Sequence, residues 1–240
     1  QEIYTSGLIS YPRTSSQQLP PAIGYTKIMT ALSQQQEYGA LCKKLLQRQG
    51  LKPNNGKKTD PAHPAIYPTG LKPKNLDKRA QRIYDIVVRR FLATFSDAAI
   101  RETVSARIDV NKEIFVAAGT TTKYKGWHEF YGPYAKYKEE ELPLVTKGET
   151  VKVDKLEMLA KETKPSARYN QASIIKELEK RNLGTKATRA DVVDTLYKRN
   201  YITGRVLEAT NLGKKIIETL SKYSPEIIDE ELTRHFEAEM

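Results

Sequence analysis

A tyrosine, an arginine and two hydroxyl side chains follow one another closely in GLISYPRTSS, residues 7–16. A phenol, with a pKa of about 10, is a weak nucleophile at neutral pH, but a nearby cation favours its ionised form. Arg13 also suits a phosphate, because its planar guanidinium matches two phosphate oxygens, and Thr14 and Ser15 add neutral donors. With Tyr11 as the nucleophile, the set is suited to attack on a phosphodiester.

A histidine in DPAHPAIYPTG, residues 60–70, could complete this chemistry. Prolines flank His63 and restrict its backbone, and an imidazole with a pKa of about 6.5 can donate a proton to a leaving oxygen or contact a phosphate. Both residues have ordinary alternatives. Tyr11 fits an aromatic residue packed on the core at a strand end, and His63 fits a structural, hydrogen-bonded histidine.

The elements that must position these residues begin with an extended strand, which stops at Pro12 and places Tyr11 and Arg13 on one side. Apolar spacing predicts one helix from Pro20 to about Gln36 and another around residues 41–46. Residues 51–75 hold many prolines and no periodicity, which predicts a long loop. A helix should follow from Leu76 to Phe95, with Asn75 or Asp77 near its start. Its predicted inner face is Ile83, Val87, Phe91 and Phe95.

The hydrophobic period changes to two after residue 98. AIRETVSARIDV (99–110) and EIFVAAGTT (113–121) predict two strands joined by a turn at Asn111-Lys112, and ETVKVDKLEML (149–159) predicts another strand. The intervening GWHEFYGPYAKY, residues 126–137, has no clear period. Residues 98 to about 160 therefore indicate an antiparallel β region.

The last region has the order of a winged-helix module. QASIIKELEKRN (171–182) and TRADVVDTLYKRN (188–200) predict helices separated by the turn LGTKA, and a hairpin in YITGRVLEAT precedes a final helix from about Asn211. TRAD is a capping-box pattern, so Thr188 should begin the second helix, with Lys186 and Arg189 beside its free backbone donors. The ordinary alternative is a cap that binds nothing.

The expected fold class is thus α+β and multidomain. We expect a helical domain at residues 1–97 that carries Tyr11, a β-rich domain at 98–162, and a winged-helix-like domain of the CAP type at 163–240.

The charge and the cysteine content narrow the class of protein. Forty Lys and Arg against 29 Asp and Glu give a net charge of +11, which favours a nucleic-acid partner, although a solvated basic surface is the alternative. The single cysteine, Cys42, excludes an internal disulfide and indicates a reducing, cytoplasmic location. No apolar run is long enough for a membrane span.

These motifs, taken together, resemble the type IA DNA topoisomerases, particularly their archaeal and topoisomerase III-like members. GLISYPRTSSQQLP (7–20) is similar to the active-site tyrosine segment and AHPAIYPT (62–69) to the histidine motif. PSARYNQASIIKELEKRNLGTKATRADVVDTLYKRNYI (165–202) resembles the family's DNA-binding helical segment, and ELTRHFEAEM (231–240) a downstream helix. The motifs occur in the family's order and cover most of the chain.

The resemblance implies roles for the chemistry-bearing residues. Tyr11 would cleave one DNA strand and hold its 5′ phosphate, Arg13 would stabilise the transition state, and His63 would assist proton transfer or DNA contact. A second strand would pass through the gap before religation, which relaxes negatively supercoiled DNA without ATP. The β region would be part of an arch around a hole that holds DNA. The implied DNA-binding residues are Thr14, Ser15, Arg168, Lys186, Thr188 and Arg189.

The chain also departs from the family pattern. Relatives often have Gly-Arg-Pro-Ser-Thr-Tyr where this chain has residues 184–189, GTKATR, so Thr188 matches while the arginine role would move to Lys186 or Arg189. Arg168 matches a family arginine, with a solvated or capping side chain as the alternative. No Asp-x-Asp motif of the family's N-terminal metal-binding (TOPRIM) domain occurs. We therefore expect a fragment without a metal site of its own, which binds single-stranded DNA and depends on the missing acidic domain and its Mg²⁺ for full activity.

Two other classes remain in view. A non-catalytic winged-helix nucleic-acid-binding module would explain the charge and the last region, but not GLISYPRTSS or AHPAIYPT. A tyrosine recombinase also forms a phosphotyrosine, but it places its nucleophile near the C-terminus, whereas Tyr11 lies near the start of this chain.

Overall fold

The computed structural model describes residues 2–239, except for the side chain of Ala238, and divides into two compact units, Gln1–Val153 and Asp154–Met240. The first unit contains the predicted helical domain and most of the predicted β region. The second unit contains the region predicted to be winged-helix-like. The finer division at residues 97 and 162 stays a prediction. No helix within residues 2–239 combines the length and apolar character that crossing a membrane requires.

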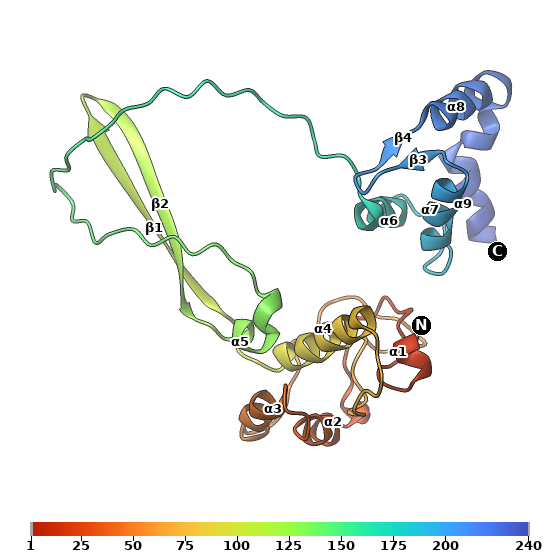
Figure 1. Cartoon of the computed structure of the whole chain (residues 1–240), viewed down its shortest axis with the longest axis horizontal. Helices are drawn as coiled ribbons and strands as arrows, with labels where there is room; N and C mark the ends of the chain where they lie inside the picture. Colours follow the sequence, from red (N-terminus) through yellow and green to blue (C-terminus); the bar gives the residue numbers. More distant parts are fainter. Residues whose placement is uncertain (1, 240) are drawn as a thin grey trace. The chain divides into compact units, whose positions relative to one another are not determined.

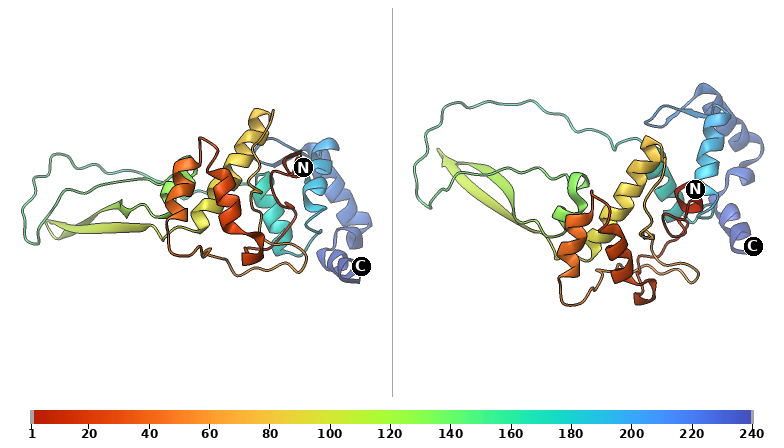
Figure 2. Two further views of the ribbon diagram at one scale, coloured as in Figure 1. Left: turned by 90° about the horizontal axis from the view of Figure 1, so that it is seen from below. Right: turned by 60° about the horizontal axis from the view of Figure 1, so that its bottom comes forward.

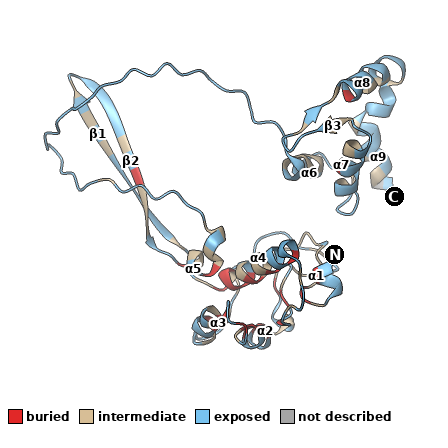
Figure 3. Cartoon of the chain, in the orientation of Figure 1, coloured by how far each residue is buried: buried red, intermediate tan, exposed pale blue. Residues whose placement is uncertain are grey.

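Helices form the core of the first unit (Figure 1). They are α1 (Glu2–Thr5), the short 3-10 helix η1 (Pro21–Ile23), α2 (Tyr25–Leu32), α3 (Gly39–Leu46) and α4 (Lys78–Thr94). Buried residues concentrate in this part of the unit (Figure 3). Most of its fully buried side chains come from three helices: Met29, Leu32, Cys42, Leu45, Tyr84, Val88, Phe91 and Leu92. Two more, Tyr38 and Pro68, lie just before α3 and in the loop before α4.

The long helix α4 begins where Asp77 caps it, since the Asp77 carboxylate accepts from the Ala80 N–H at 2.6 Å. Its predicted inner face is partly wrong. Phe91 and Phe95 are buried, but Ile83 is 43% exposed, while Tyr84 and Val88 are fully buried. The apolar stripe is shifted by one residue because the aromatic Tyr84 goes inward, where its hydroxyl accepts from the amide of the buried Gln35 at 3.1 Å.

The first described element is a helix, so the strand predicted at the start of the chain is wrong. Ile3 and Leu8 are both buried. One turn of helix directs Ile3 inward, and Gly7, with φ of 70°, then reverses the chain so that Leu8 packs on the same core.

The predicted hairpin is confirmed. Strand β1 (Ile100–Val110) pairs antiparallel with β2 (Glu113–Tyr124), and the turn falls at Asn111 and Lys112, which both have positive φ. The segment around residue 140 crosses one face of the hairpin, where the N–H of Glu140 donates to the Thr120 carbonyl at 3.0 Å. A side chain at Gly119 would collide with the Glu140 carbonyl, so glycine permits this crossing.

The segment without a clear period forms the joint between the hairpin and the helices. It contains α5 (Trp127–Tyr131) and the short η2 (Gly132–Tyr134), and α5 lies against α4 at the base of the hairpin (Figure 2). Gly126 has φ of 47° and ψ of −127°, and a Cβ there would lie 2.5 Å from the Ala98 carbonyl oxygen. The Trp127 N–H donates to the Asp97 carbonyl at 2.9 Å, which closes the joint.

The strand predicted at residues 149–159 is wrong. These residues form no strand, and Val151 and Val153 are half exposed. Alternation of apolar residues is insufficient because a strand also needs a hydrogen-bonding neighbour. Glu149 instead closes a local turn, in which its carboxylate accepts from the Thr146 N–H at 2.9 Å.

The second unit has the predicted order of helix, turn, helix, hairpin and helix. Its elements are α6 (Gln171–Lys180), α7 (Arg189–Lys198), β3 (Ile202–Thr203), β4 (Glu208–Ala209), α8 (Asn211–Tyr223), η3 (Pro225–Ile228) and α9 (Glu230–Glu239). A mixed helical and stranded fold is thus confirmed, whereas the winged-helix assignment stays a prediction.

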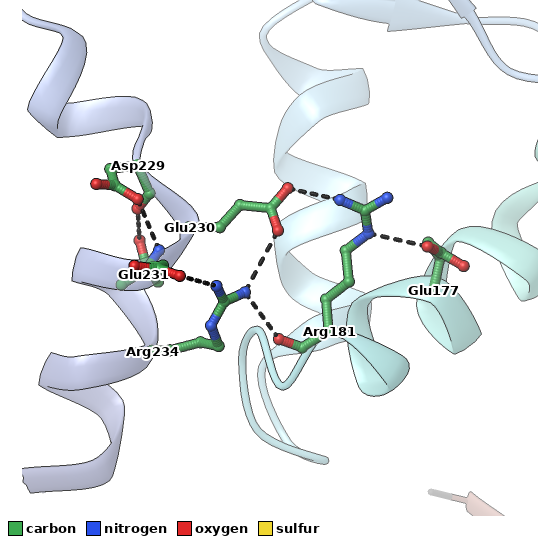
Figure 4. A network of polar contacts seen from close by, with 7 residues as sticks. Glu177, Arg181, Asp229, Glu230, Glu231 and Arg234 are labelled. Atoms are coloured by element: carbon green, nitrogen blue, oxygen red, sulfur yellow. Dashed lines mark hydrogen bonds and ion pairs between the residues drawn. The ribbon is translucent and has the colours of Figure 1, made fainter.

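Polar contacts hold α9 against α6 in this unit (Figure 4). Arg181, at the end of α6, contacts Glu177 at 2.9 Å and Glu230 of α9 at 2.7 Å. Arg234 contacts Glu230 at 3.4 Å and donates to the Arg181 carbonyl. Val193 is the one buried large apolar side chain among the described residues of this unit, and others, such as Ile174 and Leu178, are half-buried.

Candidate active site

Two segments of the first unit run side by side around Tyr11. We call residues 8–19 the tyrosine segment and residues 55–69 the histidine loop. The Thr69 N–H donates to the Leu8 carbonyl at 3.0 Å, and the Ser10 N–H donates to the Tyr67 carbonyl at 2.9 Å. Farther along, the Gln17 N–H donates to the Lys58 carbonyl at 2.8 Å. Residues from two distant parts of the sequence are thereby aligned.

The two segments lack backbone hydrogen bonds to each other at Tyr11. Pro12 and Pro64 have no N–H to donate, and no described backbone hydrogen bond joins residues 11–13 to residues 64–66. The predicted strand ending at Pro12 is therefore wrong, since only an isolated bridge between Ile9 and Pro68 has strand pairing. Strand geometry therefore does not place Tyr11 and Arg13 on one side.

Side chains meet across the open stretch. The rings of Tyr11 and His63 are 4.5 Å apart between centroids and tilted by 44°. Tyr4, from α1, contacts the other side of the constellation with its ring centroid 5.3 Å from that of Tyr11, in an edge arrangement. Tyr11 and His63 are both half-buried. The two residues proposed for chemistry are thus direct neighbours, and neither is sealed inside the core.

The hydroxyl residues beside Tyr11 connect it to the histidine loop. Thr14 Oγ1 donates to the His63 carbonyl at 3.2 Å and accepts from the Ser16 N–H at 3.0 Å. Ser15 donates to the Asp60 carboxylate from both its N–H, at 3.3 Å, and its hydroxyl, at 3.2 Å. Thr14 and Ser15 therefore have structural partners in addition to any ligand that they bind.

Arg13 is the exposed cation of the set. Its side chain makes no hydrogen bond or ion pair within the described part of the chain, and it is the residue directly between Pro12 and Thr14. A guanidinium with its donors available can bind a phosphate of an incoming ligand. The exposure of Arg13 is compatible with the role predicted for it.

The sequence reasoning missed two contacts of this constellation. Tyr4 gave no signal, because a single aromatic residue seven positions before Tyr11 is unremarkable in a chain with 14 tyrosines. Asp60 lies three residues before His63 in DPAHPAIYPTG, and an Asp before a Pro is a recognisable turn signal. Its distant partner, Ser15, could not have been found from spacing.

The remaining predicted site residues lie in the second unit. Arg189 is half-buried, and its Nε donates to the Leu183 carbonyl at 2.9 Å, which fastens the turn before α7. Gly184, in that turn, donates its N–H to the Glu237 carboxylate of α9 at 2.8 Å. Lys186 lies on the same turn, and Arg168 is exposed in the segment before α6.

The capping box predicted at Thr188 is wrong. Thr188 has a helical backbone, with φ of −97° and ψ of −25°, and its side chain caps no N–H of α7. Its hydroxyl instead accepts from the Thr185 N–H at 2.9 Å, because the turn folds back on itself before the helix starts. The capping box of this unit occurs at Asn170 and Ser173, where α6 begins.

The side chains that the structure describes offer no cluster of donors for a metal ion. Within residues 2–239, no group of three or more His, Cys, Asp or Glu side chains is arranged to hold one. The residues around Tyr11 supply an aromatic nucleophile, an imidazole, hydroxyls and a cation. These residue types are suited to nucleophilic attack on a phosphate ester, with charge stabilisation and proton transfer supplied by the protein.

Comparisons with known proteins agree with these motifs. A family model described as DNA topoisomerase matches residues 1–240. The chain is 46% identical over its whole length to DNA topoisomerase 1 of Methanothermobacter thermautotrophicus and covers 33% of that protein. It is 48% identical to DNA topoisomerase 1 of Pyrococcus horikoshii, covering 35% of it, and 32% identical to human DNA topoisomerase 3-alpha, covering 24%.

The fold also has a solved counterpart. The full-length topoisomerase I of Thermotoga maritima matches 97% of this chain with a TM-score of 0.71, at 22% identity, and this chain covers 38% of it. At that identity the likeness shows the fold. The chain spans about a third of the length of the archaeal relatives that it matches.

Proposed function

We propose a function from one premise: this chain belongs to the DNA topoisomerase family, in its type IA branch. It acts as the part of a type IA enzyme that carries the nucleophile. Tyr11 cleaves one DNA strand, holds the 5′ phosphate while another strand passes, and then releases it. The observation that carries the proposal is the direct contact between the Tyr11 and His63 rings, which brings together the two motifs from distant parts of the chain.

The cleavage step exchanges one ester for another. The Tyr11 oxygen attacks the phosphorus, the bond between phosphorus and the 3′ oxygen breaks, and the phenolic proton is replaced by the phosphoryl group. The released 3′ oxygen takes up a proton. His63 lies beside Tyr11 and is suited to assist that transfer, because an imidazole exchanges protons near neutral pH. Arg13 stabilises the charge on the phosphate.

Religation is the reverse reaction. The 3′ hydroxyl attacks the phosphotyrosine, and Tyr11 leaves with its proton restored. The phosphotyrosine bond conserves the energy of the original ester, so no nucleotide is needed. Negative supercoiling in the DNA gives relaxation its direction.

The second unit contributes DNA binding in this proposal. Its element order supports a winged-helix assignment, and Lys186, Thr188 and Arg189 gather at the turn that precedes α7. Thr188 and Arg189 have structural partners there, and Arg168 is an exposed cation in the segment before α6 that could contact a phosphate. The expected substrates are single-stranded DNA and negatively supercoiled DNA.

Metal chemistry belongs to another part of the enzyme in this proposal. Mg²⁺, as in other type IA enzymes, would neutralise phosphate charge during religation and would be bound by an N-terminal acidic domain. Tyr11, Arg13 and His63 would then meet that domain at the cleavage site. The isolated chain should bind single-stranded DNA without completing a relaxation cycle.

A covalent-adduct assay tests the proposal. This chain replaces the matching third of the Methanothermobacter relative, and the chimera is incubated with Mg²⁺ and a single-stranded oligonucleotide labelled at its 3′ end. We expect a labelled protein band that resists SDS and disappears in Tyr11→Phe. The matched control is Tyr4→Phe, which changes the neighbouring tyrosine and should keep the band.

The outcome also separates the proposal from a non-catalytic module. If the chimera binds the oligonucleotide tightly but forms no adduct, the chain is a nucleic-acid-binding module and Tyr11 is not a nucleophile. If Tyr4→Phe abolishes the band and Tyr11→Phe keeps it, the nucleophile has been assigned to the wrong tyrosine.

A further inference from the structure

Asp60 holds the tyrosine segment and the histidine loop together through a single carboxylate. One oxygen, Oδ2, accepts from the Ser15 N–H and the Ser15 hydroxyl at 3.3 and 3.2 Å. The other oxygen, Oδ1, accepts from the N–H groups of Ala62 and His63 at 3.1 and 3.3 Å. Each oxygen therefore serves a different segment, and the two segments are 45 residues apart in sequence.

We call these Asp60 contacts the carboxylate clamp. They are important because the two segments have no backbone hydrogen bonds to each other at Tyr11, beside the clamp. Pro12 and Pro64 remove the N–H groups that would otherwise fix residues 11–13 against residues 64–66. The register of Tyr11 against His63 must then come from contacts on both sides of the opening. Ser10 and Tyr67 supply one side. The other side has the Asp60 contacts, the Thr14 contact to the His63 carbonyl, and the Ala65 N–H, which donates to the Gln18 carbonyl at 2.8 Å.

We propose that Asp60 is a positioning residue for cleavage: its carboxylate fixes the distance between the Tyr11 and His63 rings and so the geometry of attack and proton transfer. This rests on the proposed function, in which Tyr11 is the nucleophile. Asp60 touches neither the substrate nor the reacting atoms in this role, and it acts through Ser15 and the His63 backbone. It is half-buried, as a carboxylate with four protein donors can be.

Asn at this position separates the two halves of the clamp. Both carboxylate oxygens of Asp60 are hydrogen-bond acceptors, whereas an amide has only one acceptor oxygen. In Asp60→Asn the side chain can therefore accept from Ser15 or from the His63 backbone, but not from both. Asp60→Ala removes both sides. The matched control is Asp109→Asn in the β1–β2 turn, where the carboxylate also accepts from a backbone N–H, that of Lys112 at 2.8 Å. It removes the same charge without touching either segment.

The first measurement follows the histidine ring in this chain. The chain has three histidines, so its imidazole ¹³C–¹H spectrum is simple, and the His63 signal is assigned with His63→Gln. Because the Tyr11 ring lies 4.5 Å from it, the His63 signal is shifted by the ring current of the tyrosine. We expect that shift to shrink in Asp60→Asn while the signals of His128 and His235 stay in place, which also shows that the variant is folded.

The second measurement uses the chimera and compares cleavage with binding. In Asp60→Asn we expect the rate of adduct formation to fall roughly 10- to 100-fold, as for a misplaced reacting group. The affinity for the oligonucleotide should change less than about threefold, since the variant removes no cation that contacts phosphate. Asp109→Asn should leave both unchanged.

The results distinguish a failure of the Asp60 positioning role from a failure of the proposed function. If the unaltered chimera forms the adduct and Asp60→Asn forms it equally fast, or if the His63 signal does not move, the positioning role is refuted and the proposed function stands. If the unaltered chimera forms no adduct, the proposed function fails, and the positioning role for cleavage fails with it.

Discussion

Replacement of Gly126 by alanine should destabilise the first unit more than any other glycine change in its loops. Gly126 has φ of 47° and ψ of −127°, a combination that L-residues avoid, and forcing alanine into it costs about 1–3 kcal/mol. The added Cβ would also lie 2.5 Å from the Ala98 carbonyl oxygen and 2.6 Å from that of Asp97. Both are backbone atoms, so no side chain can rotate away, and overpacking adds about 1–3 kcal/mol.

Replacement of a second glycine, Gly50, separates the cost of the backbone conformation from the cost of the steric contact. Gly50 has φ of 80°, but nothing lies within 4 Å of a Cβ built there. Gly50→Ala should therefore cost only the backbone term, about 1–2 kcal/mol. The expected loss for Gly126→Ala is the sum, about 2–6 kcal/mol, which is a large share of the stability of an ordinary domain, about 5–15 kcal/mol.

The assay is urea unfolding followed by tryptophan fluorescence. Trp127 is the one tryptophan of the chain and directly follows Gly126, so the signal reports the joint between α4 and the hairpin. The free energies of unfolding of the wild type, Gly126→Ala and Gly50→Ala are compared. Equal losses in the two variants, within about 0.5 kcal/mol, would refute the claim that the close approach of the Ala98 and Asp97 backbone makes Gly126 necessary.

Two further predictions concern buried polar groups in the same unit. Tyr84→Phe should lower the free energy of unfolding by about 1–3 kcal/mol. The Tyr84 hydroxyl donates to the Leu71 carbonyl at 2.9 Å and accepts from the buried Gln35 amide, and the variant loses both hydrogen bonds. The control Tyr4→Phe, at a 39% exposed site, should cost little in the same urea titration. Burial raises the pKa of the Cys42 thiol from 9.0 to about 12, so the folded state keeps a proton that the unfolded state loses. Stability should then fall as the pH rises from about 9 to about 12, and Cys42→Ala should make that fall shallower; an equal pH dependence in both proteins would contradict the burial of the thiol.

Local patterns predicted much of the secondary structure. The helix at α4, the hairpin turn at Asn111-Lys112 and the order of elements in the second unit follow from periodicity and from residues with strong backbone preferences. The strand predicted at residues 149–159 shows the limit of this reasoning. Its alternation is genuine, but strand formation depends on a partner edge, which is a property of the tertiary structure.

In the candidate site, too, the residues could be predicted from the sequence but their contacts could not. Tyr11, Arg13 and His63 were found because their residue types have clear chemistry and their motifs resemble a family. Their contacts were not found, since the meeting of Tyr11 with His63 and of Ser15 with Asp60 depends on how distant segments align. Thr188 was assigned to a helix cap on pattern alone, whereas its hydroxyl serves the preceding turn.

The distance in sequence between the two segments also has a consequence for how the protein folds. The Thr14 contact joins residues 49 apart and the Ser10 contact joins residues 57 apart, with α2 and α3 between them. Closing a loop of that length costs chain entropy before any contact repays it, so local helices form earlier and the two segments meet late. Amide hydrogens of Ser10 and Tyr67 should therefore gain protection in refolding only after those of α2 and α3. The nucleophile reaches its neighbour as one of the last events on the folding pathway.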